Sequence, residues 1–441
     1  MHFIQFIFRS SFFISQFALL LLCLPAASLA DDFELPEFDT PREDTLYASP
    51  LNFAPIEAST VSNDKSASNK SKIVPKKIPD NLNRPLQVGV FVGAKELYLK
   101  HEGETIHITA TGNKVKFLGK ENSATLDNKE IFSEGKCISI APTTKELASA
   151  CYPGHFYVSA SKGLINAVNI VDVEEYLRGV VPYEIGKLDS SRFSALESQA
   201  IAARTYAYKH FGSREAMGFD VYADTKDQVY KGLQSATPLT DSAVKATSGI
   251  VMTYGGEFII AYYHSTCGGE TETLATWERP DLPYLQSKPD LREGGTPWCN
   301  ESSYSKWERK FSDKEIEALI KKNGKEAKAN VPDFKKLKSI TVKDTLKSGR
   351  ILTLVVDTDK GKFEAKGDKV RWLFKKSGTI LPSSFFRVEH KKGEWIISGK
   401  GFGHGVGMCQ MGVRARAAAG QNFETILTHY YPGITLERFE K

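Results

Sequence analysis

One carboxylate in this sequence stands where an acid could act on a substrate. It is Glu184, in the segment Val-Val-Pro-Tyr-Glu-Ile. Pro182 has a fixed φ and also restricts the residue before it, so the chain approaches Glu184 stiffly. A carboxylate held in place can give and take a proton, which is general acid–base catalysis. The same short stretch is also typical of an ordinary solvated turn, so neighbouring segments must decide between the two.

Two helices are expected to position this carboxylate. Asp172 with Glu175, and Ser194 with Glu197, have the spacing of capping boxes at helix starts. The second helix carries small residues that let its backbone approach a neighbour closely: Ala195, Ala200, Ala203 and Ala207. We therefore expect Glu184 on a short polar loop between two capped helices.

Histidine and cysteine residues form a second group with possible chemistry. His264 and Cys267 have a spacing that can ligate zinc, and Cys299 could add a third ligand, which would leave one position open as in catalytic zinc sites. A disulfide between Cys267 and Cys299 explains the same residues in an exported protein. Cys137 and Cys151 lie in strand-like segments on either side of a turn, and we expect them to form a disulfide.

A glycine-rich run near the C-terminus contains His404. Its four alternating glycines are Gly401, Gly403, Gly405 and Gly407. The run lacks the Gly-Lys-Ser/Thr ending of a phosphate-binding loop, and too little chain follows for a βαβ unit, so nucleotide binding is excluded. Alternating glycines let the backbone approach another surface closely. A tight hairpin packed on the core is the alternative interpretation.

The 441 residues carry a formal net charge of +5, which is too mild for a nucleic-acid partner. An apolar run followed by small residues predicts a signal peptide over residues 1–30, so the protein is exported; an uncleaved anchor would be its only link to a membrane. A polar stretch predicts a disordered linker over 31–84, and period-two alternation predicts a small β domain over 85–165.

Residues 166–441 are expected to form the catalytic domain. Within it, 304–345 has a Lys-rich helical pattern that starts at a Ser312/Glu315 capping box, and 350–397 alternates like strands. The expected fold class is α+β: a catalytic domain of mixed helices and antiparallel strands, preceded by a small all-β domain.

Five separated motifs then point to a known family. They are VVPYEI, ALESQAIAARTYAY, DTKDQVYKG, YYHSTCGGETE and GKGFGHGVGMCQMGV, in this order. Over roughly residues 165–441 the chain resembles the stage II sporulation protein D (SpoIID/LytB) family. The resemblance implies a peptidoglycan lytic transglycosylase, a lyase that cleaves the MurNAc–GlcNAc bond to 1,6-anhydroMurNAc ends. It also implies that the substrate is glycan strands from which a cell-wall amidase has already removed the stem peptides. The reaction would then serve cell-wall remodelling, division or sporulation.

The resemblance also carries over individual residues. It makes Glu184 the catalytic acid and places eight residues around the glycan groove: Arg204, Gln228, Ser265, Gly268, Gly269, Glu272, His404 and Gln410. No cofactor is required, but some members carry a zinc near the active site, which suits His264 and Cys267. The chain departs from the family pattern at Cys409, where Ser is expected, and at Val413, where Ala is expected.

Two other functions stay open. The same groove could bind glycan without cleaving it, as a glycan-binding protein or a modifier of an N-acetylmuramoyl-L-alanine amidase. A zinc hydrolase built on His264 and Cys267 is the third hypothesis. In each case the expected location is the periplasm or cell envelope.

Overall fold

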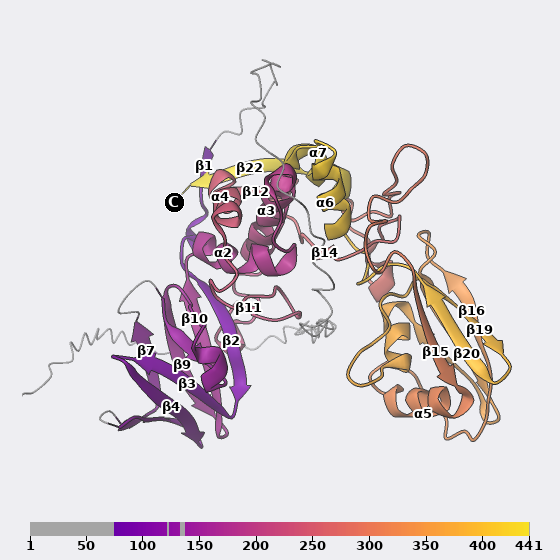
Figure 1. Cartoon of the computed structure of the whole chain (residues 1–441), viewed down its shortest axis with the longest axis horizontal. Helices are drawn as coiled ribbons and strands as arrows, with labels where there is room; N and C mark the ends of the chain where they lie inside the picture. Colours follow the sequence, from indigo (N-terminus) through magenta and orange to yellow (C-terminus); the bar gives the residue numbers. More distant parts are fainter. Residues whose placement is uncertain (1–74, 121–122, 133–136, 441) are drawn as a thin grey trace, which may run out of the picture. The chain divides into compact units, whose positions relative to one another are not determined.

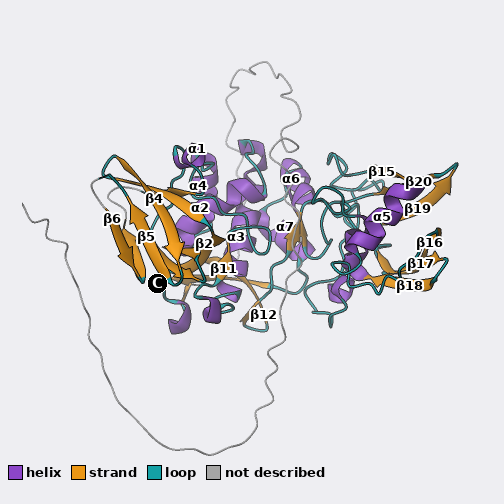
Figure 2. Cartoon of the chain, turned by 90° about the horizontal axis from the view of Figure 1, so that it is seen from below, coloured by secondary structure: helices purple, strands orange, loops and turns teal. Residues whose placement is uncertain are grey.

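The computed structural model describes residues 75–440, apart from 121–122 and 133–136. The predicted signal peptide and most of the predicted linker lie outside these residues. Within the described part, no helix is long and apolar enough to span a membrane. Figures 1 and 2 show helices and several separate sheets, so the predicted α+β class is confirmed.

The end of the predicted disordered linker is ordered. Pro75–Lys77 forms strand β1, which pairs in parallel with the C-terminal strand β22 (Thr435–Glu440), and a 3-10 turn, η2 (Asp80–Leu82), follows. Ile78 and Leu82 are buried in the main core. The prediction of disorder is therefore wrong for this part, because two apolar side chains and a free strand edge are enough to fix the segment.

The first half of the described chain is mostly antiparallel sheet. One five-stranded sheet has the order β6-β5-β4-β3-β8, and a second has the order β11-β2-β10-β9-β7. The strands are β2 (Leu86–Ala94), β3 (Glu96–His101), β4 (Glu104–Thr111), β5 (Lys114–Leu118), β6 (Ser123–Leu126), β7 (Asn128–Phe132), β8 (Ser139–Ala141), β9 (His155–Ser161) and β10 (Leu164–Val171), with the short helix α1 (Thr144–Leu147) before β9. Strand β11 (Val221–Tyr222) joins β2 in parallel, so this sheet extends beyond residue 165.

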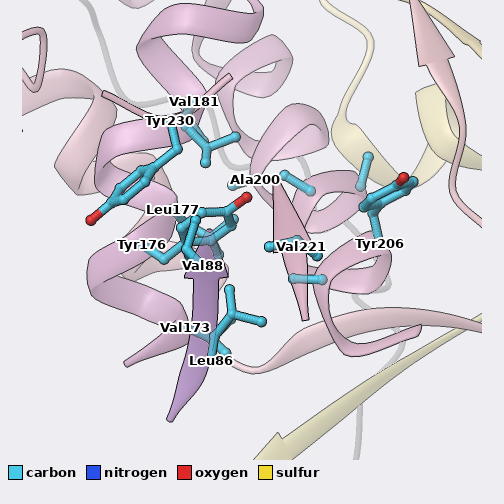
Figure 3. Close-up of a cluster of buried hydrophobic side chains, with 14 of the residues drawn as sticks. Leu86, Val88, Val173, Tyr176, Leu177, Val181, Ala200, Tyr206, Val221 and Tyr230 are labelled. Atoms are coloured by element: carbon cyan, nitrogen blue, oxygen red, sulfur yellow. The ribbon is translucent and has the colours of Figure 1, made fainter. Parts of the chain in front are cut away.

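The helices that follow share one core with these sheets. They are α2 (Val173–Glu184), α3 (Phe193–Lys209), α4 (Pro238–Ala246), α6 (Gln410–Ala418) and α7 (Phe423–Tyr430), with 3-10 turns η3 (Ser190–Arg192), η4 (Glu215–Met217) and η5 (Leu274–Trp277). A four-stranded sheet has the order β1-β22-β12-β13, with β12 (Ile250–Tyr254) and β13 (Glu257–Phe258). Figure 3 shows side chains from α2, α3, β2 and β11 gathered in one buried cluster, so α2 packs into the same core as the sheet.

A second hydrophobic core lies between Trp307 and Ile397. Its elements are β15 (Trp307–Ser312), α5 (Asp313–Asn323), β16 (Leu337–Thr345), β17 (Ile351–Thr358), β18 (Gly361–Lys366), η6 (Gly367–Phe374), β19 (Phe386–Lys391) and β20 (Glu394–Gly399). The expected helical stretch 304–345 is wrong except for α5, since strands precede and follow it. Ser312 does cap α5, with its side chain accepting the Glu315 N–H.

Of the two helix starts predicted around Glu184, the one at Asp172 is confirmed and the one at Ser194 differs. Asp172 caps α2 through the N–H of Glu174. Helix α3 starts at Phe193 without a side-chain cap, because Asp189 already caps the η3 turn before it, so the Ser194 capping box is wrong. Pro182 lies inside the last turn of α2, where its fixed φ suits a helix and only one backbone hydrogen bond is lost.

Candidate active site around Glu184

Glu184 is the last residue of α2 rather than part of a loop. Its Oε1 accepts the backbone N–H of Val229 at 2.7 Å, and its Oε2 accepts a hydrogen bond from Gln410 Nε2 at 3.3 Å. The side chain keeps some exposure to solvent. Burial of the carboxyl raises the pKa of Glu184 to about 7, although the bonds from Val229, Gln410 and Tyr263 oppose the shift. A carboxyl with this pKa can give up and take back a proton near neutral pH.

Tyr263 lies next to the Glu184 carboxylate, and a buried glutamine fixes its hydroxyl. It begins the short strand β14 (Tyr263–His264), and its hydroxyl accepts a hydrogen bond from Gln228 Nε2 at 3.0 Å. Gln228 is fully buried, and its Oε1 accepts from Tyr176 at 3.1 Å. Gln228 therefore orients Tyr263 and has no free surface for a sugar. Tyr263 is not among the site residues predicted from the sequence, although it directly precedes His264 in the YYHST motif.

His404 has a positioning role from the glycine-rich run. Its Nε2 donates to the Tyr263 carbonyl at 3.1 Å, and its Nδ1 accepts the N–H of Val406 at 3.0 Å. The ring is buried, and burial holds the pKa of His404 well below its usual value. His404 is therefore neutral and fixes the backbone that carries Tyr263.

Gln410 comes to Glu184 through the same run. The run leads into strand β21 (Met408–Cys409), which pairs in parallel with β14, and Gln410 is the first residue of α6. The carbonyl of Ser265 accepts the Met411 N–H at 3.0 Å, so the start of α6 is tied to the turn after β14. Ser265 is partly exposed there. The pairing of β14 with β21 thus brings Gln410, Ser265 and Tyr263 into the neighbourhood of Glu184.

The structure does not bring the other predicted groove residues to Glu184. Gly268 and Gly269 have positive φ and form a buried turn beside Lys400 and Pro297. Glu272 is 1% exposed, and its carboxylate accepts from the Thr273 N–H and from Ser348. Its partners therefore belong to the region where the second core meets the first.

Arg204 is the clearest correction. Its side chain is fully buried in α3 and forms two 2.7 Å bonds to the carboxylate of Glu174. It also donates to the carbonyls of Ile250 and Val244. The prediction that Arg204 contacts a glycan is wrong, because every face of the guanidinium is occupied by protein and the residue instead joins α2, α3 and β12.

The predicted zinc ligands do not form one set. His264 Nδ1 donates to the Val406 carbonyl at 3.2 Å, and its buried Nε2 has no hydrogen-bond partner within the described chain. The sulfur atoms of Cys267, Cys299 and Cys409 lie within 4.8 Å of one another, whereas His264 is not part of that group. Cys267 and Cys299 are free thiols with sulfurs 3.5 Å apart, so the alternative disulfide is not formed. Cys137 and Cys151 are joined by a disulfide.

The sequence around Glu184 matches a family model. Residues 161–254, from the last residue of β9 to the end of β12, match the stage II sporulation protein family described as SpoIID. The chain belongs to the stage II sporulation protein D family. Residues 296–407, which include the whole second core, match a domain of unknown function (DUF8618). The SpoIID match contains Glu184 and Gln228, but not Tyr263 or Gln410.

Curated relatives cover a longer stretch. The chain is 29% identical over 277 residues to an uncharacterised protein of Brachyspira hyodysenteriae, covering 62% of this chain and 69% of that protein. It is 30% identical over 298 residues to the amidase enhancer of Bacillus subtilis, covering 60% of this chain and 40% of that protein. It is 26% identical over 334 residues to stage II sporulation protein D of Bacillus subtilis, covering 72% of this chain and 88% of that protein.

Proposed function

We propose that this SpoIID family member acts at the cell wall as a lytic transglycosylase on peptidoglycan glycan strands, with Glu184 as acid and then base. The observation that carries the proposal is the pKa of Glu184, which burial raises to about 7. At neutral pH this carboxyl is divided between its two protonation states, as a group that must serve both roles requires.

The reaction needs one carboxyl and no water. Protonated Glu184 gives its proton to the glycosidic oxygen while the bond from that oxygen to C1 of MurNAc breaks. The ionised carboxylate then takes the proton of the MurNAc 6-hydroxyl, whose oxygen bonds to C1. Glu184 ends protonated again, and the product carries a 1,6-anhydro ring. A hydrolase with two carboxylates would need a second acid close by, and no acidic residue of the described chain is among the groups that shift the pKa of Glu184.

The residues around Glu184 support both stages. The Val229 N–H and the Gln410 amide donate to the two carboxylate oxygens and so stabilise the ionised form after the first proton transfer. Tyr263 and Ser265 are partly exposed next to this pair. We assign them, with Gln410, to sugar contacts, and we assign Gln228 and His404 to positioning.

The test is Glu184→Gln, assayed on glycan strands from which an amidase has removed the stem peptides. Gln keeps the shape of the side chain but cannot exchange the proton, so we expect release of 1,6-anhydromuramyl products to fall at least about 100-fold. Glu175→Gln is the matched control, because Glu175 lies on the same helix and forms an ion pair with Arg178 at the surface of the described chain. Products at wild-type levels in Glu184→Gln would show that Glu184 is not the acid.

The name of one relative, amidase enhancer, favours a second candidate. In that case the chain binds glycan and raises the activity of a cell-wall amidase without cleaving sugar bonds. The two functions separate when the purified chain is incubated with denuded strands in the absence of amidase. Cleavage releases soluble anhydro products there, whereas a pure enhancer only sediments with the strands.

A further inference from the structure

The second hydrophobic core is strongly basic, although the chain as a whole is not. Residues 296–407, which match the domain of unknown function, contain 25 lysines and arginines and 14 aspartates and glutamates, a formal net charge of +11. The whole sequence carries +5, so all its other residues together carry −6. A charge distribution of this kind attracts a polyanion to the second core rather than to the rest of the chain.

Several of these cations come together at one end of the sheet formed by β16, β17 and β18 (Figure 2). The backbone N–H groups of Lys335 and Lys336, just before β16, donate to the carboxylate of Asp359 at 2.9 and 3.1 Å. Asp359 lies in the turn between β17 and β18, and Lys360 follows it. These bonds therefore bring three lysines from two segments to the same end of the sheet.

Three further lysines join this end from neighbouring elements. Lys338 on β16 and Lys362 on β18 lie on either side of Asp357, at 3.9 and 3.7 Å from its carboxylate. In the last turn of α5, the Nζ of Lys321 lies 4.6 Å from the centre of the Phe334 ring. Six exposed lysines thus form what we call the lysine face: Lys321, Lys335, Lys336, Lys338, Lys360 and Lys362.

Few carboxylates balance the lysine face. Three lie on the same segments of chain: Asp333, Asp357 and Asp359. Two lysines share Asp357, and backbone N–H groups occupy Asp359. Within the described residues, no ion pair is formed by the remaining four lysines, Lys321, Lys335, Lys336 and Lys360. Exposed cations in excess repel one another, so a partner with spaced negative charges complements this face.

We propose, on the basis of the substrate assigned above, that the lysine face binds glycan strands through the lactyl carboxylates of MurNAc. An amidase that removes a stem peptide hydrolyses the amide bond between L-alanine and the lactyl group. The carboxylate that this leaves on the strand is ionised at neutral pH. A strand without stem peptides is therefore a polyanion with one charge for each disaccharide, and several of its charges can meet lysines at once.

The two cores then divide the work on the strand. A strand that keeps its stem peptides has the same lactyl groups blocked in amide bonds, so it offers the lysine face no carboxylate at these positions. The preference for stripped strands is thus a property of the second core, which lies outside the SpoIID match, and not of the residues around Glu184.

The test is a binding measurement with the full-length Glu184→Gln chain, which leaves the strands intact. Denuded strands carry a fluorescent label, and one portion is treated with methylamine and a carbodiimide to turn the lactyl carboxylates into neutral methylamides. At a salt concentration of about 0.05 M, we expect the charged strands to bind at least about 10-fold more tightly than the neutralised ones, and the difference to vanish near 1 M. Equal binding of the two strands at low salt would overturn the proposal.

A triple variant tests the lysine face itself. Lys335→Gln, Lys336→Gln and Lys360→Gln together remove three exposed charges, so this chain should bind charged strands at least about 5-fold more weakly. The matched control removes three exposed charges elsewhere on the second core, through Lys306→Gln, Lys314→Gln and Lys392→Gln, and should keep most of the affinity. Equal losses in the two triple variants would contradict a specific face. Circular dichroism shows that each variant is folded.

A membrane with anionic lipids is the other polyanionic surface to test. Vesicles of phosphatidylglycerol and phosphatidylcholine that bind the parent chain but not the Lys335, Lys336 and Lys360 variant, together with undiminished strand binding in that variant, would assign the face to lipid instead. The binding results do not depend on catalysis by the wild-type chain. Carboxylate-dependent binding without any released product refutes the transglycosylase and keeps the lysine face, whereas product release with carboxylate-independent binding does the reverse.

Discussion

At the scale of single residues, Glu184 is held by groups that come from distant parts of the chain. Two of its hydrogen-bond partners, Val229 and Gln410, are 45 and 226 positions away in the chain, so no local pattern contains them. The prediction that Arg204 contacts a glycan is wrong because of where its helix lies in the fold. The helix that carries it is buried on nearly every side, and its many small residues could have shown that an arginine there lies inside the protein.

The raised pKa of Glu184 predicts how activity depends on pH. Since the first step needs the protonated carboxyl, kcat/KM on denuded strands should fall as pH rises through about 7. A pH–rate profile of the wild-type protein checks this. A profile that is flat from pH about 5 to 9 would contradict the assignment of Glu184 as the acid.

The same shift has a consequence for stability. The pKa of the folded state lies above the usual value, so the folded protein holds the proton more tightly, and stability is lost as pH rises from about 4.5 to about 7. The loss amounts to at most about 3 kcal/mol, because the side chain is partly exposed. Glu184→Gln should therefore unfold at a higher temperature than wild type at pH about 8, with no such difference at pH about 4.

At the scale of elements, the alternation of apolar and polar residues predicts strands well, and glycine spacing predicts turns well. A Lys-rich stretch with helical periodicity instead predicts too much helix. The Lys-rich residues 304–345 suggest one long helix, but only Asp313–Asn323 is helical. Strands β15 and β16 on either side are decided by pairing with β20 and β17, which come later in the chain. The glycine-rich run is correctly expected to approach another surface. That surface is partly Arg350, which sequence alone did not indicate.

Two glycines with similar backbone angles test this close approach. Gly405 has a φ of 87°, and a Cβ there would overlap the Arg350 guanidinium. Gly420 has a φ of 83° with nothing within 4 Å of the same position. Gly420→Ala should lower the free energy of unfolding by about 1 kcal/mol through backbone strain alone. Gly405→Ala should lower it by at least about 2 kcal/mol more. Equal losses in urea unfolding would show that Arg350 does not constrain the run.

At the scale of the whole molecule, the described chain contains two hydrophobic cores. The sequence predicts a single catalytic segment over residues 166–441, because nothing in a local pattern shows which strands share a core. The SpoIID match lies in segments that pack around the first core, and so do the segments that carry Val229 and Gln410, the hydrogen-bond partners of Glu184. The second core contributes Arg350 and Ser348 at the border with the first. We therefore expect the chemistry to depend on the first core and its Glu184.

The reaction of the full-length chain with denuded strands in oxygen-18 water tests the central claim most directly. Lytic transglycosylation takes its oxygen from the sugar's own 6-hydroxyl. Mass spectrometry should therefore find muramyl products that are lighter by one water than reducing sugars and contain no oxygen-18. Products with reducing ends that carry the label would show hydrolysis, and no soluble product at all would show that the protein does not cleave the strands.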